Sequence, residues 1–271
     1  MIKKSMKNIQ SHCGNFPKYK NWLDTSDYIL KLAEKLAKIY KKRKARYKDE
    51  FEFITLFFFV KSFFTFRAVN ILAKEKLGPD AAMLMRTLLE NVAYLSYISE
   101  KPKKYSKDYL LYEIKEKKIL KDILEKDAEW FKRTEKVLRE KGEEVLNYYE
   151  KLKGKYPGYQ WSGKSITELI KHIPGKDKTT YGLIYSRLSA LSHSYPSIIR
   201  CYIKDIPGGI ITDIQQNEGY LYETLPTISI LFFMILDKFN NVFKLKQDKK
   251  IKAAEKKLKK THSQEKLTTE R

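Results

Sequence analysis

The sequence contains little glycine, proline or cysteine. Of its 271 residues, 11 are glycine and 8 are proline, which is too little turn-forming material for the many tight turns of an all-β protein. The two cysteines, Cys13 and Cys201, form no CxxC pair and no disulfide framework. These absences argue against a small secreted scaffold. They predict reduced thiols and a cytoplasmic location.

Long uninterrupted apolar runs are also missing. The N-terminal segment has lysines but no apolar core, so it does not look like a signal peptide. The stretch Phe51–Leu72 is interrupted by Glu52, Lys61 and Arg67, and Thr224–Leu236 has 13 residues, whereas a membrane span needs about 20. We therefore expect two buried core helices here and no membrane span.

The chain is rich in apolar residues at helical spacing. Apolar residues make up 42% of the sequence, which is enough for a sizeable core. Thr25 and Ser26 are expected to cap a helix that runs to about Lys48, with one apolar face and one lysine face. Further helices are predicted at about 49–77, 79–99, 105–154 (one helix or two), 179–195 and 220–243, and Ser165–Glu168 has the pattern of a capping box.

These elements predict an all-α fold with a single bundle of about seven to eight helices. The expected organisation is an N-terminal arm at 1–24, the bundle at 25–243 and a basic tail at 244–271. The tail has helical composition but little to bury, so it is expected to be frayed or partly disordered. Residues 205–219 are the best candidate for a loop or hairpin.

The formal net charge of +22 is concentrated at the two ends. Residues 1–48 hold 14 lysines and arginines against 3 acidic residues, and residues 244–271 hold 11 against 4. Basic arms on a nearly balanced body favour RNA or another polyanion as partner, although solvated lysine faces explain the same pattern. The residues expected to bind nucleic acid are Lys41, Lys42, Arg43, Lys44, Arg46, Lys256, Lys257, Lys259 and Lys260.

Arg86 and Glu90 form the first candidate site. They lie four residues apart on one face of a predicted helix and are surrounded by apolar residues. Charged groups in such a setting must be paired. The pair is either an internal ion pair that fixes the register of the helix or part of a binding or catalytic site.

Arg187 and His193 form the second candidate. Ser186, Ser189 and His193 share one polar helical face, which is small enough for another helix, or a second copy of the chain, to approach closely. Histidine is the side chain best suited to proton transfer near neutral pH. A hydrogen-bonded histidine in a helix interface is the alternative interpretation.

Three short segments resemble a bacterial family of all-helical proteins known only as a domain of unknown function. They are Arg86-Thr-Leu-Leu-Glu90, Trp161-Ser-Gly-Lys-Ser-Ile and Leu191-Ser-His193-Ser. The resemblance covers about residues 50–200. It implies a helical domain and supplies no activity.

The spacing of Arg187 and His193 is similar to the Arg-x(4–6)-His signature of the HEPN superfamily, whose helical domains occur in toxins and antiphage ribonucleases. This resemblance implies a metal-independent endoribonuclease in a bacterial defence or toxin system. His193 would then handle the proton, Arg187 would stabilise the charge on the phosphorane, and Arg86 and Glu90 would order the site. The chain departs from the signature at Leu188, where a polar residue is common. Residues six apart on a helix also point about 120° apart.

Two other site classes are poorly supported by the sequence. Residues 158–165 match the Walker A pattern letter by letter, but no strand pattern precedes them, so a P-loop nucleotide binder is only a minor alternative. The four histidines are scattered, and we expect neither a metal nor a cofactor. The main alternative to the ribonuclease is a non-catalytic helical module that binds nucleic acid or a protein partner.

Overall fold

The computed structural model describes residues 19–42, 47–112, 161–175, 178–193, 195, 198, 203–206, 209–212 and 218–269. Residues 102–112 are helical, and strands β1 (Ile203–Ile206) and β2 (Gly209–Thr212) pair as an antiparallel hairpin. The other helices are α2 (Lys20–Lys42), α3 (Glu50–Lys74), α4 (Gly78–Glu100), α7 (Ile166–Ile170), α8 (Lys178–Ser192), α9 (Leu221–Val242) and α10 (Asp248–Thr269). The all-α class is confirmed. The hairpin overlaps residues 205–219, where one was expected, and begins two residues earlier.

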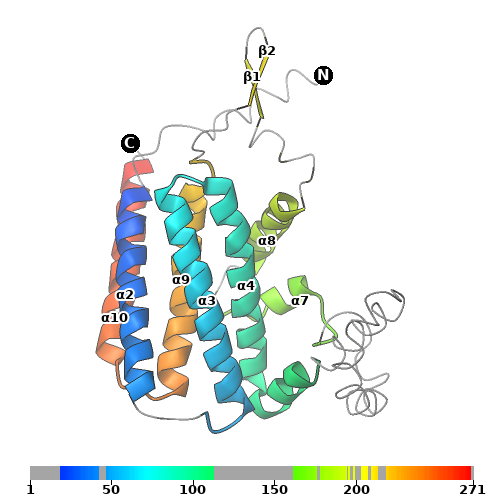
Figure 1. The fold of residues 1–271 in the computed structure, drawn as a ribbon, viewed down its shortest axis with the longest axis vertical. Coiled ribbons are helices and arrows are strands. Elements are labelled where there is room, and N and C mark those ends of the chain that lie inside the picture. Colours follow the sequence, from blue (N-terminus) through cyan, green and yellow to red (C-terminus); the bar gives the residue numbers. More distant parts are fainter. Residues whose placement is uncertain are drawn as a thin grey trace, which may run out of the picture.

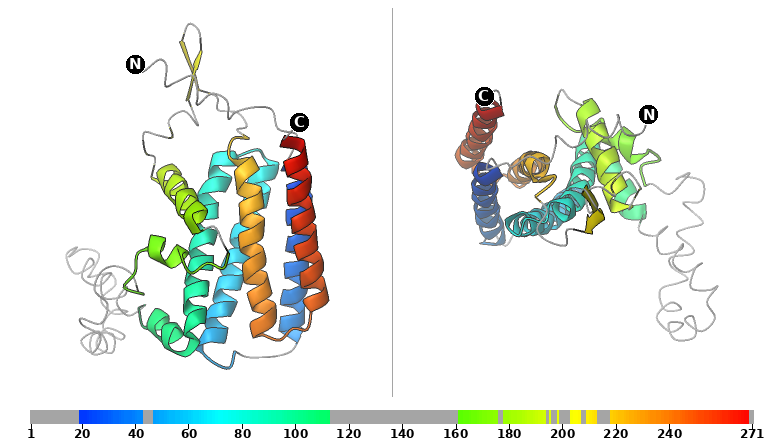
Figure 2. Two further views of the ribbon diagram at one scale, coloured as in Figure 1. Left: turned by 180° about the vertical axis from the view of Figure 1, so that it is seen from behind. Right: turned by 90° about the horizontal axis from the view of Figure 1, so that it is seen from above.

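Helices α3, α4 and α9 form the centre of the bundle (Figure 1). Helix α2 packs against α3 and α9, and α10 lies along α2 on the outside. Helices α7 and α8 pack against α4, on the side of the bundle away from α2 and α10 (Figure 2). This order places α4 between the central helices and α8.

Aromatic side chains hold the central helices together. Phe59 of α3 stacks on Phe239 of α9 with ring centroids 3.9 Å apart, and Phe66 stacks on Phe232 at 4.6 Å. All four rings are at most 3% exposed. Burying rings of this size is the main favourable contribution to packing α3 on α9.

The first helix starts earlier than the sequence suggested. Helix α2 begins at Lys20, so Thr25 and Ser26 lie inside it and do not cap it. Both are buried: the Thr25 hydroxyl is 2.9 Å from that of Thr261 in α10, and the Ser26 hydroxyl is 2.9 Å from that of Ser229 in α9. The two residues are polar contacts between helices, because their hydroxyls meet partners distant in sequence.

The C-terminal segment also differs from the expectation of a frayed tail. Helix α10 spans 22 residues and contacts α2 and α9. Ile251, Ala254 and Leu258 are buried, and their spacing puts them on one helical face. The segment therefore has an apolar stripe to bury, and this stripe docks α10 on the bundle.

Helix α3 was expected to be a buried core helix, but one of its faces is exposed. Together with α9, it is long and apolar enough to cross a membrane by length and composition, with 39% of its most apolar window buried against 50% for α9. One face of α3 exposes large apolar side chains to solvent, namely Phe53, Phe57, Val60, Phe64 and Ile71. Its opposite face packs on α4 and α9.

The capping box predicted at the start of α7 is confirmed. The Ser165 backbone N–H donates to Glu168 Oε2 at 2.8 Å, the Ser165 hydroxyl donates to the same oxygen at 2.8 Å, and the Glu168 N–H donates back to Ser165 Oγ at 3.3 Å. The backbone bond from Ser165, followed by the bond from its hydroxyl, lowers the pKa of Glu168 below its ordinary value.

The Ser165→Ala variant is expected to raise the pKa of Glu168 part of the way back, because the backbone donor remains. Since the folded-state pKa is depressed, the carboxylate stabilises the fold above its unfolded-state pKa, and this contribution disappears as the pH falls through the folded-state value. An NMR titration of the Glu168 carboxyl measures the shift. Thr167→Ala, at an exposed neighbouring position, is the control; equal pKa values in the two variants would refute the role of the hydroxyl.

Candidate functional site

Arg86 and Glu90 lie one turn apart on α4. Arg86 Nε donates a hydrogen bond to Glu90 Oε1 at 3.0 Å. The two side chains are 22% and 27% exposed, so the pair is mostly shielded but still reached by solvent. This is the pairing that the sequence predicted.

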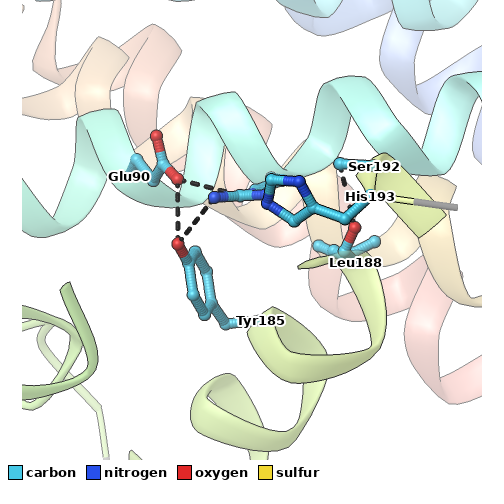
Figure 3. Close-up of polar contacts among 6 residues, drawn as sticks. Glu90, Tyr185, Leu188, Ser192 and His193 are labelled. Atoms are coloured by element: carbon cyan, nitrogen blue, oxygen red, sulfur yellow. Dashed lines mark hydrogen bonds and ion pairs between the residues drawn. The ribbon is translucent and has the colours of Figure 1, made fainter. Parts of the chain in front are cut away.

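Helix α8 brings Tyr185 to the same pair. Arg86 Nη2 donates to the Tyr185 hydroxyl at 3.0 Å, and that hydroxyl donates to Glu90 Oε1 at 3.2 Å. The guanidinium carbon also lies 5.1 Å from the centre of the Tyr185 ring. Figure 3 shows Tyr185 reaching from α8 toward Glu90 on α4. The three side chains form a closed triangle of hydrogen bonds.

His193, the residue directly after α8, completes the cluster. Its Nε2 lies 3.1 Å from Arg86 Nη1. A guanidinium group can only donate, so Nε2 is the acceptor in this contact. The His193 side chain is exposed at the surface, so the cluster opens to solvent on this side. We call Arg86, Glu90, Tyr185 and His193 the Arg86 cluster.

The rotation of α8 is fixed by buried leucines. Leu188 and Leu191 are 3% and 2% exposed, and the Ser192 hydroxyl donates to the Leu188 carbonyl at 2.9 Å (Figure 3). Tyr185 lies one turn before Leu188 and His193 follows Leu191 by two positions. Burial of the leucines therefore sets the direction in which both polar side chains leave α8.

Contacts within the cluster shift the pKa values of Arg86 and Tyr185. Burial acts to lower the pKa of Arg86, but the hydrogen bond to Glu90, the neighbouring Tyr185 and the charge of Glu90 leave it above its ordinary value. Burial, followed by the Glu90 charge, raises the pKa of Tyr185 although Arg86 opposes this. Near neutral pH the site therefore holds a guanidinium cation and a protonated phenol.

Arg187 does not join His193. Its Nη1 lies 3.0 Å and 3.3 Å from the two carboxylate oxygens of Glu223 in α9, and its guanidinium lies 5.7 Å from the centre of the Tyr220 ring. The side chains of Arg187 and Glu223 are 58% and 50% exposed. The arginine that meets His193 is Arg86, because residues six apart on a helix point in different directions.

The basic residues expected to bind nucleic acid lie in two places. Lys41 and Lys42 are exposed in the last turn of α2, whereas Arg43, Lys44 and Arg46 lie outside the described residues. On α10, Lys256, Lys259 and Lys260 are exposed. Lys257 lies over the Tyr28 ring at 4.8 Å. Lys256, Lys257 and Lys260 also line a groove of about 410 Å³ between α2 and α10.

The described residues give little support to a metal site or to a P-loop nucleotide site. Among them, no group of three or more His, Cys, Asp or Glu side chains could hold a metal ion. The Walker-like segment ends at Ser165, where the N-terminus of α7 is occupied by the Glu168 carboxylate. A phosphate at that helix end would have to compete with this carboxylate.

The fold and the cluster define a helical-bundle protein with an arginine-centred polar site between two helices, α4 and α8. The chain belongs to a family of unknown function, DUF5677, whose pattern matches residues 52–210. This range contains the whole Arg86 cluster and confirms the resemblance to a family of unknown function. No curated protein and no solved structure matches the chain. The likeness to the HEPN superfamily stays a hypothesis.

Two contacts of the candidate residues were missed from the sequence. Tyr185 was not among the candidate residues, although it stands only two positions before Arg187 on the same predicted helix. Glu223, the ion-pair partner of Arg187, is likewise far away in sequence. Neither contact leaves a local spacing signal, because each joins two helices.

Proposed function

We propose that this protein is a metal-independent endoribonuclease and that its centre is the Arg86 cluster. The observation that carries the proposal is the contact between Arg86 Nη1 and His193 Nε2 at 3.1 Å. It joins a permanent cation to an imidazole at a solvent-reached edge, and such a pair of groups can promote cleavage of a phosphodiester.

The cation has capacity to bind a phosphate. A guanidinium group carries more N–H donors than the three acceptors Glu90, Tyr185 and His193 use. Glu90 and Tyr185 hold the guanidinium plane from the α4 and α8 sides. A phosphate approaching from the His193 side would meet an oriented fork of donors, the geometry that favours arginine in phosphate recognition.

The chemistry needs no further group from the protein. An incoming phosphate takes over Arg86 Nη1 and so frees the lone pair of His193 Nε2. This nitrogen accepts the proton of the RNA 2′-hydroxyl, and the resulting oxygen attacks the adjacent phosphorus. The bond to the 5′-oxygen breaks, and that oxygen takes a proton from water. The hydroxide that is left takes the proton from His193, which returns to its starting form. The products are a 2′,3′-cyclic phosphate and a 5′-hydroxyl end. Arg86 stabilises the extra negative charge of the phosphorane.

The test is cleavage of a labelled single-stranded RNA in excess EDTA. We expect the wild-type protein to cut it and His193→Ala to lose about 10²–10⁴-fold in rate, the usual contribution of a general acid or base. His172→Ala is the matched control, because His172 is bound to Glu100 away from the cluster and should leave the rate unchanged. RNA that stays intact at concentrations where the wild-type protein binds it would refute the proposal.

A second function is favoured by the lysines of α10. Lys256, Lys259 and Lys260 are exposed on α10, where Lys259 is bound to Glu255 at 2.6 Å. A helix rich in lysine suits a non-catalytic module that binds the backbone of a nucleic acid. That function accounts for RNA that is bound, released by salt and never cut. The same cleavage assay therefore separates the two functions.

A further inference from the structure

The exposed apolar side chains of the described residues are concentrated on α3. The nine large hydrophobic residues that are exposed include seven between positions 47 and 77, and five of these lie on α3 itself, at 39% to 60% exposed. The five follow one another at helical spacing and form one stripe, which we call the α3 stripe: Phe53, Phe57, Val60, Phe64 and Ile71. Such contiguous apolar faces mark binding surfaces.

The α3 stripe is symmetric in its chemistry about Ser62. Phe53 and Ile71 lie nine positions on either side of this residue, and Val60 and Phe64 lie two positions on either side. Ser62 itself is buried on the opposite face of α3, where its hydroxyl accepts a bond from Asn91 at 3.0 Å. The centre of the stripe is therefore at the height of Ser62 along the helix.

Two charged positions beside the stripe, Arg67 and Lys74, follow the same symmetry. Phe57 and the exposed Arg67 lie five positions on either side of Ser62, and Glu50 and Lys74 lie twelve positions on either side. Apolar positions are thus matched with apolar ones, an aromatic ring with a guanidinium, and a carboxylate with an ammonium. A lipid surface or an unrelated partner would not require this matching.

We infer that the α3 stripe is the interface between two copies of this chain, whose α3 helices pack antiparallel across a two-fold axis at the height of Ser62. A two-fold interface is formed by the same patch on both copies, so it demands self-complementarity. In this arrangement Phe53 faces Ile71 of the second copy, and Val60 faces Phe64.

The polar contacts are satisfied as well. Phe57 presents its ring to Arg67 of the second copy, a favourable cation–π geometry. Lys74, which pairs with Asp27 at 2.9 Å, meets Glu50 of the second copy and is placed between two carboxylates. The pairing uses a 25-residue helix, about 37 Å long at 1.5 Å per residue, and does not involve the Arg86 cluster.

The experiment is a charge-complementation test of mass by analytical ultracentrifugation at tens of micromolar chain. The wild-type protein is expected at about twice its chain mass of 32.1 kDa. Val60→Glu and Phe64→Lys are each expected as monomers, because each places two charges in an apolar interface. An equimolar mixture of the two is expected to regain the dimer mass, since each chain then offers the charge that the other lacks.

The mixture also protects the test against misfolding, because chains that cannot fold cannot recover by mixing. Leu183→Lys is the matched control: Leu183 is a 63% exposed leucine on α8, and the variant should remain dimeric. A monomeric wild-type protein overturns the inference, and so does a dimer that survives both single substitutions, which would move the interface to another face such as that of Ser186 and Ser189. Monomers that sediment with phosphatidylglycerol vesicles through Val60 would assign the stripe to a membrane surface instead.

Discussion

The Arg86→Lys variant is expected to remain folded and to cut RNA about 10²–10³-fold more slowly than the wild-type protein. A lysine keeps the charge, but its single ammonium cannot reach Glu90, Tyr185 and His193 with the fixed fork that Arg86 uses at 3.0–3.1 Å. Single-turnover cleavage of a labelled RNA measures the rate, and circular dichroism verifies the fold.

Arg187→Lys is the matched variant, since it makes the same change on α8, outside the Arg86 cluster. Arg187 pairs with Glu223 at an exposed site, where an ammonium serves nearly as well, so its rate should stay within a few-fold of the wild-type value. The two arginines thus separate the site seen here from the HEPN-type pair of Arg187 and His193. If Arg187→Lys is the inactive variant and Arg86→Lys the active one, our assignment is wrong.

The Leu258→Ala variant is expected to lower the free energy of unfolding by about 2–3 kcal/mol, the lower part of the range for truncating a buried leucine. Leu258 is 6% exposed and belongs to the stripe that docks α10 on α2 and α9. Urea denaturation followed by circular dichroism measures the change. Lys259→Ala is the control, because it alters an exposed neighbour on the same helix and should cost less than about 0.5 kcal/mol. Equal free energies of unfolding for the two variants would contradict the docking of α10 and support the frayed tail expected from the sequence.

The docking of α10 affects how the lysines are tested. Deleting residues 244–271 would remove the buried face of α10 together with its charges, so a loss of RNA binding would have two causes. Substituting glutamine for Lys256, Lys259 and Lys260 removes charge and leaves Ile251, Ala254 and Leu258 in place. The slope of affinity against salt concentration then reports the contribution of these lysines.

The sequence predicted the elements whose signals are local. The helical spacing of apolar residues located α3, α4 and α9, and the Ser165–Glu168 pattern located the start of α7, because each depends on residues within one or two turns of each other. The Arg86–Glu90 pair belongs to the same group. The apolar spacing of Ile251, Ala254 and Leu258 was also present, but the many lysines around it concealed a short stripe.

Features that depend on contacts between helices were not predicted. Thr25 and Ser26 have the residue types of a helix cap, and only their partners Thr261 and Ser229 reveal them as buried hydroxyls. His193 was paired with Arg187 because the two are close in sequence. The structure pairs it with Arg86, which is 107 positions away. The exposure of one face of α3 depends on which helices surround it, so the composition of α3 could not show it.

The Arg86 cluster is divided between two helices that differ in how firmly they are held. Helix α4 is enclosed by α3, α9 and α8, whereas α8 is a 15-residue helix at the edge of the bundle. Short peripheral helices detach at a lower free energy than the core does. The contacts of Arg86 with Tyr185 and His193 therefore depend on the docking of α8, whereas the bond from Arg86 to Glu90 lies within α4 and would survive the loss of α8.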